Sequence, residues 1–270
     1  MELPRSERMA ARLEILDECG STNTELVRRA SSQHGGDWPD LSVLVTLNQT
    51  DGRGRLGRVW VAPPGRAIAI SVLLRPRLPA GEPLGLEHYG WLPLIAGVAM
   101  TRTVATMLPE HSVTLKWPND VQVDGLKVSG LLAELLPTQD AVVMGAGLNL
   151  SFEEDELPTS TSTSLSLNGV ALDGPALADA ALSGFLGEFA PLYAEFLRLG
   201  ADEEASGVAE AVADVCSTIG QPVKVQLPGG DVLVGTATDI DRTGRLVVTR
   251  STDGRVTAVA AGDVTHLRYE

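Results

Sequence analysis

The sequence contains few cysteines, few aromatic residues and no long hydrophobic run, and each shortage excludes a class of protein. The 270 residues include only 2 cysteines, Cys19 and Cys216, which are too few for a disulfide framework. Aromatic residues make up 4%, so the core must be aliphatic. The longest apolar run, residues 91–100, is too short to cross a bilayer. No leader-like segment opens the chain, so we expect a cytoplasmic protein with free thiols.

Positive charge is also scarce. The 21 Lys and Arg residues face 35 Asp and Glu residues, which gives a net charge of −14. This balance argues against a general nucleic-acid binder and against an anionic membrane surface as a partner. Among the cations, lysine occurs only as Lys116, Lys127 and Lys224, and a retained lysine can mark a place that needs a compact charge.

Hydrophobic periodicity predicts an α/β protein with a smaller all-β part at its end. Strands are expected at residues 13–16, 43–47, 67–74, 113–117 and 142–150, and helices from about residue 22, at 90–108 and at 174–199. Thr22 is expected to cap the first helix, with Glu25 completing a capping box. Asp124-Gly125 predicts a type I′ hairpin, and residues 153–168 are expected to form a loop, followed by a weakly helical stretch at 200–213.

From about residue 217 the segments become short and are separated by glycine-containing turns. Five strands are expected, at residues 222–227, 232–240, 246–249, 256–260 and 266–269. We therefore predict two domains, residues 12–213 and residues 217–270.

Residues 52–58 alternate glycine and arginine between two predicted strands: Gly52, Arg53, Gly54, Arg55, Gly57 and Arg58. Glycines allow successive backbone N–H groups to face an anion, and arginines add forked donors for phosphate or carboxylate. A solvated flexible loop and a single-stranded RNA segment are alternative interpretations. A P-loop is excluded, because the pattern GxxxxGK[ST] is absent.

Three further segments place polar groups at predicted strand ends. Lys116, Asn119 and Asp120 supply a cation, an amide and an oxygen ligand suited to Mg²⁺, although a simple turn beside a buried Trp117 would look the same. Lys127 and Ser129 should share one strand face. Gly145 and Gly147 interrupt a strand, which indicates that another group approaches its backbone closely. Together these segments suit a nucleotide whose phosphates are attacked by a small acid.

The motifs resemble those of the biotin protein ligases. The residues that carry the resemblance are Ser21-Thr22-Asn23, Gly52-Arg53-Gly54-Arg55-Leu56-Gly57-Arg58-x-Trp60, Lys116-Trp117-Pro118-Asn119-Asp120, Lys127-Val128-Ser129-Gly130 and Gly145-Ala146-Gly147-Leu148-Asn149. The match covers roughly residues 12–150, and the tail from residue 217 is similar to the small SH3-like domain of the family. The implied fold is α/β (α+β): a mixed β-sheet flanked by helices, like that of class II aminoacyl-tRNA synthetases, followed by an SH3-like barrel.

The resemblance also implies an activity, that of a biotin–[biotin carboxyl-carrier protein] ligase. Biotin and MgATP would give biotinyl-5′-AMP and pyrophosphate, and a lysine of a biotin carboxyl carrier domain of an acyl-CoA carboxylase would then take the biotinyl group. The implied catalytic residues are Lys127, Arg53, Arg55, Asp120 and Lys116. The implied biotin contacts are Ser21, Thr22, Asn23, Gln49, Gly52, Arg53, Lys127, Gly130, Leu132, Gly145 and Gly147. The implied ATP or adenylate contacts are Arg55, Arg58, Trp60, Lys116, Asn119, Asp120, Lys127 and Asn149, with Asp120 as the metal ligand.

Two rival functions share parts of this pattern. A lipoate–protein ligase or octanoyltransferase would have a related fold, but the complete motif set and the C-terminal strands favour biotin. A bifunctional ligase–repressor would carry a winged-helix domain before the catalytic part. Only 20 residues precede Ser21, so we expect no operator binding.

Overall fold

A seven-stranded mixed sheet forms the larger part of the computed structural model, which describes residues 1–32, 35–227, 230–260 and 263–266. Its strand order is β1 (Arg12–Leu16), β2 (Ser42–Thr46), β5 (Ala67–Leu74), β9 (Val142–Asn149), β8 (Leu126–Leu135), β7 (Asp120–Val123) and β6 (Val113–Lys116). The β1–β2 pair is parallel and the other pairs are antiparallel. The expected mixed sheet flanked by helices is confirmed.

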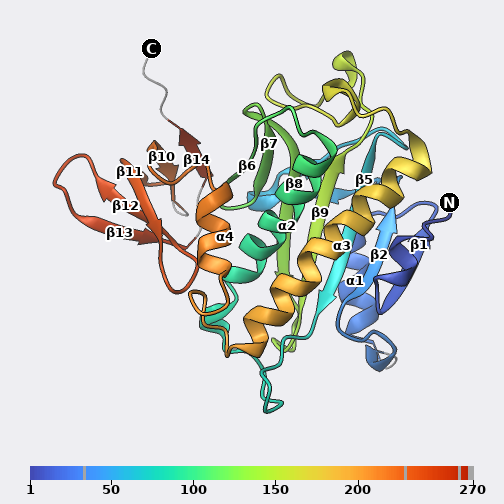
Figure 1. Cartoon of the computed structure of the whole chain (residues 1–270), viewed down its shortest axis with the longest axis horizontal. Coiled ribbons are helices and arrows are strands. Elements are labelled where there is room, and N and C mark those ends of the chain that lie inside the picture. The colour runs from blue at the N-terminus through green and yellow to red at the C-terminus, as the bar shows by residue number, and fades with distance from the viewer. Residues whose placement is uncertain (33–34, 228–229, 261–262, 267–270) are drawn as a thin grey trace.

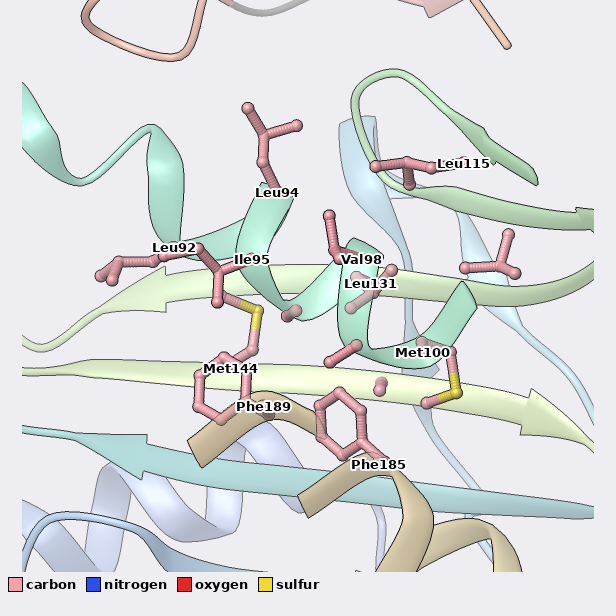
Figure 2. Packing of buried hydrophobic residues seen from close by; sticks show 14 of the residues in the cluster. Leu92, Leu94, Ile95, Val98, Met100, Leu115, Leu131, Met144, Phe185 and Phe189 are labelled. Carbon is pink, nitrogen blue, oxygen red and sulfur yellow. The ribbon is translucent and has the colours of Figure 1, made fainter. Parts of the chain in front are cut away.

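The two long helices cover one face of this sheet (Figure 1). α2 (Trp91–Met107) is apolar on nearly all sides, as expected for a helix between the sheet and another helix, and α3 (Gly174–Arg198) packs against it. Figure 2 shows Leu92, Ile95 and Val98 of α2 in one buried cluster with the rings of Phe185 and Phe189. Those two rings stack with centroids 5.6 Å apart.

The opposite face is covered in part by α1 (Thr22–Ala30). Strand residues alternate between the faces, so Leu44, Leu73 and Val143 pack with Leu26 of α1 while their neighbours face α2 and α3. The cap of α1 is Ser21, whose hydroxyl accepts from the Thr24 amide at 3.4 Å. The expectation that Thr22 caps the helix was therefore wrong, because Thr22 is already helical.

The turn predicted at Asp124-Gly125 and the helical stretch predicted near residue 208 are both present. Asp124 and Gly125 have φ values of 50° and 83°, which confirms the type I′ hairpin between β7 and β8. The weakly helical stretch continues into α4 (Val208–Val215), which packs on α2 and β6. Short 3₁₀ turns complete this part at Ser6–Arg8, Gly35–Asp37, Leu86–His88, Glu154–Glu156 and Ser166–Asn168.

The smaller part is a five-stranded antiparallel sheet beside the β6 edge (Figure 1). Its strands are β10 (Pro222–Gln226), β11 (Val232–Ile240), β12 (Leu246–Arg250), β13 (Val256–Val259) and β14 (Asp263–His266). β14 begins three residues before the expected last strand at 266–269 and is in register with β10, and residues 267–270 lie outside the described part.

Hydrogen bonds join the two sheets. The Trp117 amide donates to Thr218 Oγ1 at 3.0 Å, and Trp91 Nε1 donates to the Arg242 carbonyl at 2.9 Å. Gly90 and Gly244 approach so closely that a Cβ on Gly90 would lie 2.2 Å from the Thr243 carbonyl oxygen. The small sheet is thereby held against the segment that contains Lys116 and Asp120. None of the helices in the described ranges is long and apolar enough to span a bilayer.

Candidate active site

Two adjoining hollows lie where α1, the middle residues of β8 and β9 and the glycine–arginine segment meet. The inner cavity is lined by Ser21, Thr22, Asn23, Gln49, Arg53, Trp60, Ala69, Ile70, Gly130, Leu132, Gly145, Ala146 and Gly147. The outer cleft is lined by Arg53, Gly54, Arg55, Arg58, Val59, Trp60, Val61, Lys116, Asn119, Asp120, Lys127, Gly130, Leu131, Leu132, Asn149, Pro158, Thr159, Thr161, Ser162 and Val264. Their shared residues make them one continuous site.

The glycine–arginine segment is a short hairpin rather than a plain loop. β3 (Gly52–Arg53) pairs with β4 (Val59–Trp60), and a 3₁₀ turn at Arg55–Gly57 joins them. Leu56 takes a left-handed φ of 57° in this turn, and the Gly54 amide donates to the Arg58 carbonyl at 2.7 Å. The hairpin brings Trp60 over the sheet and places Arg55 and Arg58 on the outer cleft.

The two glycines of β9, Gly145 and Gly147, leave room for neighbouring side chains to contact the strand backbone. A Cβ at Gly145 would lie 2.4 Å from Asn23 Oδ1, and one at Gly147 would lie 2.5 Å from Trp60 Cε2. The predicted close approach to this strand is confirmed, and the approaching groups are Asn23 and Trp60. Gly52 lines neither hollow, but a Cβ there would lie 2.6 Å from Gln49 Nε2.

The polar groups of the inner cavity are held by other protein groups. Gln49 Oε1 accepts from the Thr22 amide at 2.9 Å and from the Thr22 hydroxyl at 3.2 Å. Asn23 Oδ1 accepts from Ser71 Oγ at 2.6 Å, and Asn23 Nδ2 donates to the Leu132 carbonyl and to Glu134 Oε2. The amide orientations of Gln49 and Asn23 are thus set before any ligand arrives.

Sequence reasoning missed Glu134, whose carboxylate also forms an ion pair with the Arg53 guanidinium. The signal was available, because strand alternation puts Glu134 on the same face as Gly130 and Leu132, which were predicted to line the site. A strand glutamate is usually a solvated surface residue, and its partner lies on a distant segment.

Cations dominate the outer cleft. Lys127 Nζ lies 2.6 Å from Asp120 Oδ1 and 5.7 Å from the centroid of the Trp60 ring. Arg55 Nη1 donates to Asn119 Oδ1 at 3.0 Å, which ties the hairpin tip to the turn after β6. Asn119 Nδ2 in turn donates to the Leu131 carbonyl at 2.9 Å.

Burial and mutual repulsion act on these cations. Burial lowers the pKa of Lys116, neighbouring Lys127 and Arg58 lower it further, and Asp120 opposes the shift. Burial also lowers the pKa of Arg55, which Asp120 again opposes. The site therefore holds several cations with little compensating negative charge, which favours an anionic ligand such as a polyphosphate.

Asp120 is the acidic side chain among the described residues that line the outer cleft. No group of three or more potential His, Cys, Asp or Glu metal ligands occurs in the described part of the chain. One carboxylate beside phosphate oxygens is nevertheless what Mg²⁺ commonly uses, because it keeps several waters. The residues fit a metal that enters with a nucleotide rather than one held by the protein alone.

A polar segment that sequence reasoning left as a loop completes the cleft. The Lys127 amide donates to the Thr161 carbonyl at 2.8 Å, and the Thr163 amide donates to the Lys127 carbonyl at 2.8 Å. Asn149 is buried and its Nδ2 donates to the Thr163 carbonyl at 2.8 Å. These bonds place Thr159, Thr161 and Ser162 on the cleft, and their only sequence signal was a run of serines and threonines.

Comparisons with known proteins agree with this geometry. Residues 20–149 match the Biotin/lipoate A/B protein ligase family, and residues 218–267 match the Biotin protein ligase C terminal domain. The chain is 38% identical over 258 residues to the biotin–[acetyl-CoA-carboxylase] ligase of Mycobacterium tuberculosis, an alignment that covers 95% of this chain and 89% of that protein. The chain belongs to the biotin protein ligase family.

Solved structures are similar to this ligase over almost its whole length. The biotin protein ligase from Aquifex aeolicus in complex with biotin and ATP is 25% identical, with a TM-score of 0.70 and coverage of 96% of this chain and 100% of that one. The enzyme from Leishmania major in complex with biotinyl-5-AMP is 26% identical, with a TM-score of 0.58 and coverage of 93% and 99%. The bifunctional ligase/repressor BirA of Escherichia coli is 31% identical over 169 residues, which span 61% of this chain and 49% of that protein.

The ligase brings its predicted site residues together, with some redistribution. Ser21, Thr22, Asn23, Gln49, Gly145 and Gly147 line the inner cavity; Arg55, Arg58, Lys116, Asn119, Asp120, Lys127 and Asn149 line the outer cleft; Arg53, Trp60, Gly130 and Leu132 line both. Lys127 lines only the outer cleft, although its Nζ lies close to Gly130, which lines both hollows. Gly52 lines neither hollow and contributes the backbone of the hairpin beside Gln49. Their contacts with particular ligands stay predictions.

Proposed function

We propose that the ligase activates biotin with ATP and transfers it to a lysine of a biotin carboxyl carrier domain. The observation that carries this proposal is the junction of the two hollows. A cavity with fixed, polar side chains opens directly onto a cleft that contains Arg55, Arg58, Lys116 and Lys127. That arrangement suits a substrate with a neutral polar head and an anionic tail that must meet a polyphosphate.

In the first half-reaction a carboxylate oxygen of biotin attacks the α-phosphorus of ATP. The new C(O)–O–P linkage forms as the bond from the α-phosphorus to the bridging oxygen breaks, and pyrophosphate leaves with that electron pair. Both reactants are anions, so the barrier is dominated by their repulsion and by positioning. Lys127, which contacts Asp120 and Trp60, would neutralise charge where the two anions meet, and the half-buried Lys116 would add a second cation.

In the second half-reaction a neutral acceptor lysine attacks the acyl carbon of biotinyl-5′-AMP. A C–N bond forms, the C–O bond to the phosphate breaks, AMP leaves as an anion, and the amine proton passes to solvent. Water would compete for the same carbonyl carbon. The hairpin, tied to Asn119 through Arg55, is the element that would cover the intermediate.

The remaining assignments follow the residues that line the cleft. Trp60 and Asn149 would contact the adenine and Asp120 would hold Mg²⁺, and their places in the lining of the cleft support these assignments. The metal would screen phosphate charge when bound. A cytoplasmic location is supported by the requirement for ATP and by the two free, buried cysteines.

Biotin-dependent exchange of labelled pyrophosphate into ATP tests the first half-reaction, and biotinylation of a purified carrier domain tests the second. We expect both activities with biotin and neither with lipoate. Lipoate is the relevant alternative because the family matched by residues 20–149 includes lipoate ligases, whereas the match over residues 218–267 favours biotin. Exchange stimulated by lipoate and not by biotin would overturn the proposal.

A further inference from the structure

Glu134 connects two segments that converge on the inner cavity. It lies in β8 beyond the last residue paired with β7, with its side chain 25% exposed. Its Oε2 accepts from Asn23 Nδ2 at 2.8 Å, and its other oxygen forms the ion pair with Arg53. One carboxylate therefore joins α1 to the glycine–arginine hairpin, although Glu134 does not itself line the cavity.

The Asn23 side chain makes three hydrogen bonds within this connection. Its Oδ1 accepts from Ser71, and its Nδ2 donates to Leu132 and Glu134. Gly145 provides the room, since any Cβ there would collide with the Asn23 amide. An amide held from three sides acts as a wall of fixed position rather than as an adaptable ligand contact.

The ion pair also sets the charge of the inner cavity. Arg53 is the cationic side chain among the described residues that line this cavity, and Glu134 neutralises it. In the outer cleft, by contrast, Asp120 is the carboxylate among the described lining residues, and it acts on Arg55, Lys116 and Lys127 together. An anionic group is therefore drawn to the cleft, and a neutral polar group can occupy the cavity without competing for an unpaired guanidinium.

We propose that Glu134 is a positioning and specificity-determining residue that orients biotin by neutralising Arg53 and fixing Asn23. It makes the inner cavity accept the neutral ureido head and reject a second carboxylate, so that the single carboxylate of biotin points toward Lys127. This inference rests on the proposed function, because it assumes that biotin is the acid that binds here.

The experiment compares wild type, Glu134→Gln and Glu195→Gln. Glutamine keeps the size of Glu134 and removes its charge, whereas Glu195→Gln removes a comparable ion pair, with Arg198, on the solvent side of α3. Calorimetry measures the Kd of biotin and of azelaate, a linear dicarboxylate with a second anionic end. Pyrophosphate exchange gives KM for biotin and kcat separately.

For Glu134→Gln we expect the Kd and KM of biotin to rise roughly tenfold, as for loss of a charge-assisted hydrogen bond, with kcat at saturating biotin nearly unchanged. Azelaate should bind this variant more tightly than wild type, because Arg53 becomes available to its second carboxylate. Glu195→Gln should match wild type in all four quantities. A purely structural role would weaken both ligands together, and that result would overturn the proposal.

Glu134→Asp provides a second test if the glutamine variant is poorly folded by circular dichroism. Aspartate keeps the charge but is shorter, so rejection of azelaate should persist while biotin binding weakens. Tight binding of azelaate by Glu134→Asp, or unchanged biotin binding by Glu134→Gln, would contradict the inference. If wild type itself does not bind biotin, the proposed function fails instead, and the two failures are distinguishable.

Discussion

The inner cavity and the outer cleft share a wall but differ in how their polar groups are satisfied. In the cavity, Asn23 and Gln49 hydrogen-bond to protein groups and Arg53 has an acidic partner. In the cleft, burial and like charges lower the pKa of Lys116, and burial lowers the pKa of Arg55. The cavity is preorganised without ligand, whereas the cleft reaches electrostatic balance only when an anion binds.

This difference has a consequence for the order of events. A preorganised cavity can take biotin with little rearrangement, while the cleft gains most from ATP and from the adenylate. Substitutions in the cleft should therefore impair chemistry more than biotin binding.

Lys127→Ala should reduce biotin-dependent pyrophosphate exchange by about a thousandfold, because a cation facing two reacting anions is lost. The Kd of biotin should change much less, since the cavity residues keep their partners. Lys224→Ala, which removes an exposed lysine of β10, is the control and should leave exchange at the wild-type rate. Near-normal exchange in Lys127→Ala would remove this lysine from the mechanism.

Arg55→Gly should break the contact between the hairpin and Asn119 and release biotinyl-5′-AMP from the site. We expect at least a tenfold rise in free adenylate, measured by chromatography, and labelling of lysines on bystander proteins. Arg77→Gly is a suitable control, because Arg77 is exposed and bonds only to the Gly81 carbonyl among the interactions described for it. Strict acceptor specificity in Arg55→Gly would assign Arg55 another role.

The use of ATP in the outer cleft and the binding of biotin in the inner cavity should depend differently on pH. Lys116 is useful when protonated, and its lowered pKa means that this charge is lost at a lower pH than for an ordinary lysine. The value of kcat/KM for ATP should therefore fall as pH rises through that pKa, with biotin affinity nearly constant over the same range. Lys116→Arg should remove this alkaline decline, because arginine stays protonated. A decline that persists in Lys116→Arg would show that another group titrates.

Thr218→Val should produce the smallest effect and test the small sheet. It leaves the buried Trp117 amide without its acceptor, in the segment that contains Lys116 and Asp120. An increase of about fivefold in KM for ATP is expected, with unchanged Kd for biotin. Thr238→Val, at an exposed position of β11, is the control. If Thr218→Val weakened the binding of ATP and of biotin equally, the small sheet would contribute only to the stability of the protein.

Local pattern predicted much of the fold because apolar periodicity and turn chemistry act over a few residues. β5 and the Asp124-Gly125 turn match the expectation closely. Where two neighbouring residues were both suitable caps, the choice between Ser21 and Thr22 was wrong. Thr22 is the first helical residue, and its amide and hydroxyl donate to Gln49, 27 residues away along the chain.

The residues of the candidate site also divide into those that the sequence predicted and those that only the fold revealed. Its glycines and cations were found because their residue types and spacing are themselves the signal. Glu134 and Ser71 were not found, because each acts through Asn23, 111 and 48 residues away. The Ser162 segment was also missed, since its position on the cleft depends on bridging to the Lys127 strand.

The sequence by itself determined which groups are available: an aliphatic core, glycines where a backbone must be approached, and cations near two strand ends. Only the tertiary structure decided which of those cations remain without a carboxylate of their own. Arg53 and Arg55 are two residues apart and chemically identical, yet Arg53 meets Glu134, 81 residues along the chain, and Arg55 meets a neutral asparagine. Electrostatic energy depends on distance in space, and the fold alone sets that distance.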